Sequence, residues 1–181
     1  MVEKTSTVSA SLLQQIPIFQ SLAPALLGDV ASQIKIEKVK SGQIICRVGD
    51  SAEEMFVLLA GSLSVYVNKG QVPHKLTYMK KSIHDPEDKD FYPFFGETAL
   101  VATASFTRSA NVKSLEDSIL MVIPASVMQT LMEQGEAFYK DILEQAKTNL
   151  ERSQRLETSL GINSLSVKSR RDSHDHEQLG V

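Results

Sequence analysis

Two short segments contain residues that together could bind a ligand carrying a phosphate. The first is Phe95, Gly96, Glu97, Thr98, Ala99 and Leu100, and the second, seven residues later, is Arg108, Ser109 and Ala110. A glycine lets the backbone approach an anion, and the residues after it can form one helical turn whose free N–H groups point at a phosphate. The planar guanidinium of Arg108 can meet the remaining phosphate charge. These segments therefore predict a buried anion site.

Glu97 indicates that the ligand carries more than a phosphate. A carboxylate repels phosphate, so we expect Glu97 to face a donor such as a ribose hydroxyl, and it also offers Arg108 a counter-charge. Arg108 stands at the start of an apolar segment, where a charge needs an anionic partner. A phosphate and a free ribose hydroxyl occur on one rigid ring in a cyclic nucleotide, which is the predicted ligand.

The same residues resemble the phosphate-binding cassette of the cyclic nucleotide-binding domain family. That family includes protein kinase A regulatory subunits, cyclic nucleotide-gated channels and bacterial catabolite activator proteins. The resemblance extends from about residue 12 to about residue 160 and includes residues 16–19, the Gly49-Asp50 turn and Gly61. It implies a β-barrel with an N-terminal helical element that moves on ligand binding and a C-terminal helix that closes over the base. For the N-terminal helices, packing without a switching role is the alternative. The chain departs from the family at residues 101–107, a longer linker than usual without the proline often found before the arginine.

The identity of the base depends on Ser109 and on the C-terminal helix. Family members with alanine at this position tend to prefer cyclic AMP and those with threonine can favour cyclic GMP, so serine leaves both open; we favour cyclic AMP. Phe138, Tyr139 and Ile142 are candidates to cap the purine, because an aromatic face stacks on any base. Core packing at helical spacing is the alternative for each of the three.

Composition excludes several classes of protein. The chain has 181 residues, 42% hydrophobic and 23% charged, as is typical of a soluble globular protein. A net charge of -3 gives no electrostatic basis for binding nucleic acid or an acidic membrane. The single cysteine, Cys46, fits a reducing compartment and a buried core position. Because no segment resembles a signal peptide or a membrane span, we predict a cytoplasmic protein.

The elements that must position the cassette follow from periodicity. Apolar residues at helical spacing predict two short helices before residue 35, separated at Pro17 and Pro24. Short strands punctuated by glycines at roughly ten-residue spacing follow. We therefore predict a mainly β fold with flanking helices, a jelly-roll β-barrel with N-terminal helices and a long C-terminal helix. The polar segment 69–93 is interpreted as a loop insertion.

The second half of the chain is predicted to hold strands at residues 108–113 and 118–123, a short helix at 124–132 and a long helix at 136–160. Residues 1–11 are expected to form a flexible N-terminus, 12–160 the cyclic nucleotide-binding domain and 161–181 a disordered tail. In the tail, Ser173 follows two arginines in a pattern that basophilic kinases phosphorylate. A chance match is the alternative for so short a motif.

Other function classes find little support in the sequence. A barrel oxygenase needs two histidines and a carboxylate inside the barrel. His74 and His84 fall in the predicted loop, and His174 and His176 fall in the tail, so no metal site is predicted. No glycine-flanked nucleophilic serine is present, and the tail is too short for a helix-turn-helix. We therefore expect that the protein is not an enzyme. We expect a sensor or regulatory module in which residues 136–160 contact a protein effector or mediate self-association. An adaptor that has lost the ligand is the alternative.

Overall fold

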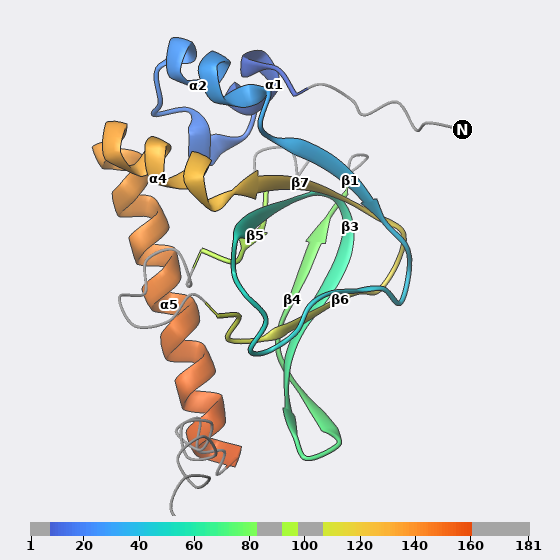
Figure 1. The fold of residues 1–181 in the computed structure, drawn as a ribbon. Helices are drawn as coiled ribbons and strands as arrows, with labels where there is room; N and C mark the ends of the chain where they lie inside the picture. Colours follow the sequence, from blue (N-terminus) through green and yellow to red (C-terminus); the bar gives the residue numbers. More distant parts are fainter. Residues whose placement is uncertain (1–7, 83–91, 98–106, 161–181) are drawn as a thin grey trace, which may run out of the picture.

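The computed structural model describes residues 8–82, 92–97 and 107–160. The helices are α1 (Ala10–Gln14), the 3-10 turn η1 (Pro17–Phe19), α2 (Pro24–Ala31), α4 (Ala125–Gln134) and α5 (Glu136–Leu160). The strands are β1 (Lys35–Val39), β2 (Ile44–Cys46), β3 (Glu54–Lys69), β4 (Val72–Lys81), β5 (Phe94–Phe95), β6 (Asn111–Ser114) and β7 (Ser118–Pro124). The predicted mainly β fold, with helices before and after the barrel, is confirmed (Figure 1).

The long strand β3 joins the two halves of the barrel. All pairings are antiparallel, in the order β1-β7-β3-β6-β2, and β4 and β5 also pair with β3. Residues 54–60 of β3 pair with β7, whereas residues 61–69 pair with β4. The change of partner occurs at Gly61, which has φ +105° and lies so close to Ser118 that a Cβ would collide with it. Glycine therefore allows the strand to turn this corner.

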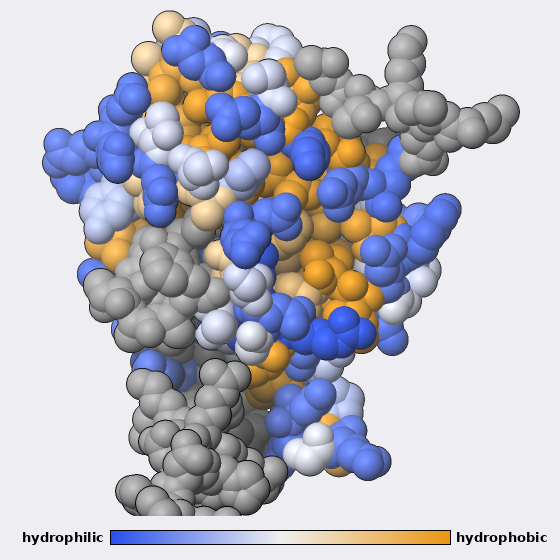
Figure 2. Space-filling model, viewed as in Figure 1, coloured by the Kyte–Doolittle hydropathy of each residue, from blue (hydrophilic) through white to orange (hydrophobic). Residues whose placement is uncertain are grey.

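Both faces of the first half of β3 are buried, which explains its continuous apolar sequence. Met55 and Val57 face a core shared with the helices, and Phe56 and Leu58 face a second core inside the barrel. β7 alternates in the same way, since Met121 and Ile123 belong to the first core and Leu120 and Val122 to the second. In the view of Figure 2, hydrophobic side chains fill the part of the barrel that the ribbon leaves open. We call these two groups the helix-side core and the barrel core.

The helices pack at one end of the barrel, and α5 runs alongside it (Figure 1). Phe138 at the start of α5 stacks on Phe19 of η1, with ring centroids 5.8 Å apart. Both side chains are fully buried in the helix-side core. Within the described residues, no helix has a stretch long and apolar enough to cross a membrane.

The structure corrects the predicted loop insertion at residues 69–93. Residues 72–81 form strand β4, which pairs with β3 along its whole length, from Lys69↔Val72 to Gly61↔Lys81. The strand was missed because many of its side chains are polar and face solvent. His74 lies on β4 opposite Val67, so the prediction that it falls in a loop was also wrong. His84 lies outside the described residues.

Candidate functional site

Arg108 is buried at the edge of the barrel core, with 7% of its surface exposed. Its Nη1 donates a hydrogen bond of 2.8 Å to the carbonyl oxygen of Glu54, and the guanidinium lies 5.2 Å from the centre of the Phe56 ring. Its Nε is buried and has no hydrogen-bond partner among the described residues. None of the ion pairs found in that part of the chain includes Arg108. A guanidinium held this way retains donors for an anion.

The turn between β2 and β3 fixes the backbone of Arg108. The amide of Arg108 donates to the carbonyl of Asp50, and the amide of Gly49 donates to the carbonyl of Arg108, each over 2.9 Å. Within the turn, Asp50 accepts a hydrogen bond of 2.8 Å from the amide of Arg47. The predicted Gly49-Asp50 turn thus bonds directly to Arg108.

Gly96 gives the guanidinium room beside the backbone. Gly96 has φ +92°, a conformation that side chains disfavour. A Cβ at this position would lie 2.6 Å from Nη1 of Arg108 and 3.0 Å from the carbonyl oxygen of Glu54. The absence of a side chain at Gly96 therefore lets Arg108 reach the carbonyl oxygen of Glu54. This role is additional to the one predicted from the sequence, in which the glycine lets the backbone approach an anion.

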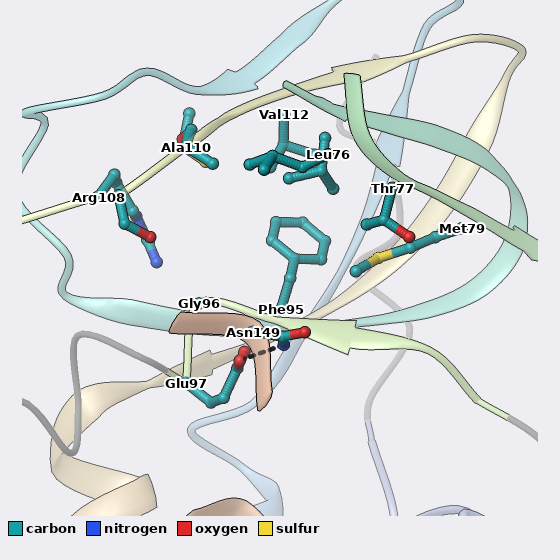
Figure 3. Close-up of a pocket in the computed structure, with 13 residues that line it drawn as sticks. Leu76, Thr77, Met79, Phe95, Gly96, Glu97, Arg108, Ala110, Val112 and Asn149 are labelled. Atoms are coloured by element: carbon teal, nitrogen blue, oxygen red, sulfur yellow. Dashed lines mark hydrogen bonds between the residues drawn. The ribbon is translucent and has the colours of Figure 1, made fainter. Parts of the chain in front are cut away.

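A pocket with about 590 Å³ of empty space, part of it open to solvent, lies between Arg108 and α5. Its charged and polar side chains are Glu97, Arg108, Ser109, Thr77 and Asn149, and its remaining lining residues are Cys46, Val65, Leu76, Met79, Phe95, Gly96, Ala110 and Val112. Figure 3 shows Phe95 between the β4 residues and the Arg108 side. An apolar wall with a few convergent polar groups suits a ligand with an aromatic base and a charged end.

Glu97 is 1% exposed and bonds to the C-terminal helix. Asn149 of α5 donates from Nδ2 to Oε1 of Glu97 over 2.6 Å, the dashed line in Figure 3. No ion pair joins Glu97 to Arg108, both of which lie in the described part of the chain, so the predicted counter-charge contact is not formed. Asn149 is the pocket residue that sequence reasoning missed most clearly.

The residues predicted to cap the base lie elsewhere. Phe138 and Ile142 are fully buried in the helix-side core, and Tyr139 is 41% exposed; none of the three lines the pocket. These residues begin the helix, where it packs on η1 and α4, and the pocket faces a later turn. Phe138 and Ile142 therefore contribute to core packing, the alternative given for them, and a role of the three residues in capping a base stays a prediction.

Cys46 is buried, as predicted, and its thiol lines the pocket. Burial raises the pKa of the Cys46 thiol above its ordinary value of 9.0, while the positive charge of Arg108 acts in the opposite direction. The Sγ atom lies 3.9 Å from the carbonyl oxygen of Ala110. At neutral pH the thiol is thus a neutral part of the wall.

The structure brings six of the nine predicted cassette residues into this one pocket: Phe95, Gly96, Glu97, Arg108, Ser109 and Ala110. The other three, Thr98, Ala99 and Leu100, lie outside the described residues, as does Ser173. Three residues of β4 that were assigned to a loop also line the pocket: Leu76, Thr77 and Met79. The roles of all these residues in ligand binding stay predictions.

The chain is similar to proteins of one family in both sequence and fold. The family model described as cyclic nucleotide-binding domain matches residues 36–135. The cyclic nucleotide-gated potassium channel mll3241 of Mesorhizobium japonicum is 29% identical over 137 residues, which cover 74% of this chain and 34% of the channel. The chain spans about a third or less of the length of the curated relatives it matches.

Solved structures share the fold at lower identity. The sensor domain of the transcriptional regulator DNR from Pseudomonas aeruginosa has a TM-score of 0.62 at 15% identity, covering 85% of this chain and 92% of that one. The regulatory domain of Toxoplasma gondii PKA, crystallised with cAMP, has a TM-score of 0.59 at 20% identity, covering 77% of this chain and 48% of that one.

Proposed function

The chain belongs to the cyclic nucleotide-binding domain family, and on that premise we propose that it is a sensor or regulatory module that binds a cyclic nucleotide beside Arg108. Binding is passed to a partner through α5, which borders the pocket. The family is defined by ligand binding and not by catalysis, so we propose no enzymatic activity. The partner is a protein effector or a second copy of the chain, and the cytoplasmic location stays a prediction.

One observation carries the proposal. The guanidinium of Arg108 is buried in a pocket with no ion-pair partner among the described residues, and its Nε has no hydrogen-bond partner there. A buried charge is costly unless an opposite charge compensates it. The single negative charge of a cyclic phosphate supplies that compensation. Glu97, in the same pocket, is an acceptor for the ribose hydroxyl.

The preferred ligand within this proposal is cyclic AMP, with cyclic GMP as the second candidate. The solved Toxoplasma structure was crystallised with cAMP, which supports this order. Ser109 is exposed and lines the pocket, so its hydroxyl is available to the phosphate or to the base. Phe95 and the β4 residues Leu76 and Met79 supply the apolar wall for the purine.

Calorimetric titration of the wild-type chain with cyclic AMP and cyclic GMP tests the proposal. Arg108→Ala should weaken binding by about 3 to 5 kcal/mol, a loss of hundreds-fold or more, because the phosphate charge is left unpaired. Glu97→Gln should cost less, about 1.5 to 3 kcal/mol, because the phosphate remains paired. Arg47→Ala is the matched control: Arg47 is an exposed arginine on the turn that supports Arg108, and it does not line the pocket.

Two outcomes would contradict the proposal in different ways. Equal binding by wild type and Arg108→Ala would show that the ligand lies elsewhere. No binding by wild type to either nucleotide would leave the ligand-free adaptor, acting through α5 alone, as the function.

A further inference from the structure

Among the described residues, Asn149 makes a polar contact between α5 and the pocket. Among the described residues it is the one from α5 that lines the pocket, and it lies 52 residues from Glu97 in the chain. Its Nδ2 donates to Oε1 of Glu97 over 2.6 Å, a short hydrogen bond (Figure 3). Glu97 is almost completely buried, so this contact strongly affects how its carboxylate is oriented.

A second hydrogen bond fixes which end of the Asn149 amide faces Glu97. Gln145, one helical turn earlier, donates from Nε2 to Oδ1 of Asn149 over 3.2 Å. With its oxygen engaged by Gln145, Asn149 turns its NH2 group toward the carboxylate. The side-chain amide of Gln145 thus donates to Asn149, Asn149 donates to Glu97, and the Glu97 carboxylate is the final acceptor of this series of hydrogen bonds.

The bond to Asn149 leaves the carboxylate able to accept from a ligand. A carboxylate has two oxygens with about four lone-pair positions, so Oε1 can hold Asn149 while the group also accepts from a ribose hydroxyl. Asn149 and the sugar then bind the same group together, and neither has to displace the other.

Resting on the function proposed above, we propose that Asn149 is a positioning residue of the ligand site. It orients the Glu97 carboxylate for the ribose hydroxyl and fastens α5 beside the pocket. Two apolar residues of α5, Phe138 and Ile142, pack in the helix-side core and do not line the pocket. In this proposal, the hydrogen bond between Asn149 and Glu97 couples the binding of the sugar at Glu97 to the position of α5.

Two ligands separate this role from a merely structural one: cyclic AMP and its 2′-deoxy analogue, which lacks the hydroxyl. Calorimetry on the full chain should show wild type binding the analogue roughly tenfold or more weakly. Asn149→Ala should bind cyclic AMP roughly tenfold more weakly than wild type does. The ratio of its affinity for cyclic AMP to its affinity for the 2′-deoxy analogue, which measures the preference for the hydroxyl, should fall to about a few-fold. The reason is that the Glu97 carboxylate is oriented less firmly without the hydrogen bond from Asn149, and it therefore gains less from the hydroxyl.

Two further variants sharpen the comparison. Thr148→Ala is the matched control, because Thr148 is exposed and its hydroxyl donates back to Glu144 within the helix; it should behave as wild type. Asn149→Asp places a second carboxylate beside Glu97, and like charges repel, so it should bind cyclic AMP more weakly than Asn149→Ala.

The results distinguish failure of this inference from failure of the function on which it rests. If Asn149→Ala weakens both ligands equally and keeps the wild-type preference for the hydroxyl, the residue only supports the fold. Tighter binding of cyclic AMP by Asn149→Ala would show that Asn149 competes with the ligand, the opposite of positioning. Wild type that binds neither ligand removes both proposals, whereas the first two results remove only this one.

Discussion

Gly96 and Arg108 act as a pair, because the glycine has a backbone conformation and a close contact that no other residue tolerates. Gly96→Ala should therefore displace the guanidinium and weaken cyclic nucleotide binding by roughly tenfold or more, with a loss of stability of about 1 to 3 kcal/mol. Calorimetry and urea unfolding measure the two effects. Gly70→Ala is the control: Gly70 also has positive φ, +61°, but a Cβ there meets nothing within 4 Å. Equal affinity losses in the two variants would argue against the pairing.

Cys46 should make stability depend on pH in the alkaline range. Burial raises the pKa of the thiol in the folded chain, so the folded state favours the neutral thiol. The resulting contribution to the free energy of unfolding is fully present below the ordinary pKa of 9.0, and it is lost as pH rises through the folded-state pKa. The difference in unfolding free energy between wild type and Cys46→Ala should be constant up to about pH 9 and then shrink. Urea unfolding from about pH 7 to about pH 10.5 checks this. A difference that grows above pH 9 would contradict the direction of the shift.

At the scale of elements, sequence patterns predicted the strands that have a buried face. β7 was found because its apolar residues are continuous, and the long helix was predicted with the bounds that α5 has. β3 was predicted as short strands separated at Gly61, whereas it runs through this glycine as one strand. β4 was missed because, among the described residues, it pairs with β3 alone and exposes polar side chains. Asn149 could not be found, since a polar residue on a helix carries no sign of a contact 52 positions away.

The helix α5 should affect affinity beyond its role in packing. A chain ending before Gln145 keeps Phe138 and Ile142 in the helix-side core but loses Asn149. We expect it to retain the far-UV circular dichroism of a folded barrel and to bind cyclic AMP roughly tenfold more weakly or to lose self-association. Calorimetry and light scattering provide the measurements. Unchanged affinity together with unchanged mass would show that the later part of α5 only packs.

At the scale of the whole molecule, the two cores should unfold together. β3 and β7 supply side chains to both, so neither core can open without breaking strands of the other. Phe138→Ala in the helix-side core should cost about 3 to 5 kcal/mol and Val112→Ala in the barrel core less, each lowering the midpoint of one common transition. Scanning calorimetry distinguishes this from independent units. A separate low-temperature transition in Phe138→Ala would show that the helices melt alone.

The β3–β4 hairpin has a practical consequence at its tip. The tip extends away from the barrel (Figure 1), and its residues 69–73 are exposed. Extra chain inserted at Gly70 would emerge into solvent without touching either core or the pocket. A fluorescent protein inserted there would be joined directly to β4, which carries the pocket residues Leu76, Thr77 and Met79, so we expect its emission to report occupancy of the pocket. The hairpin thus offers a place to build an optical biosensor from this chain.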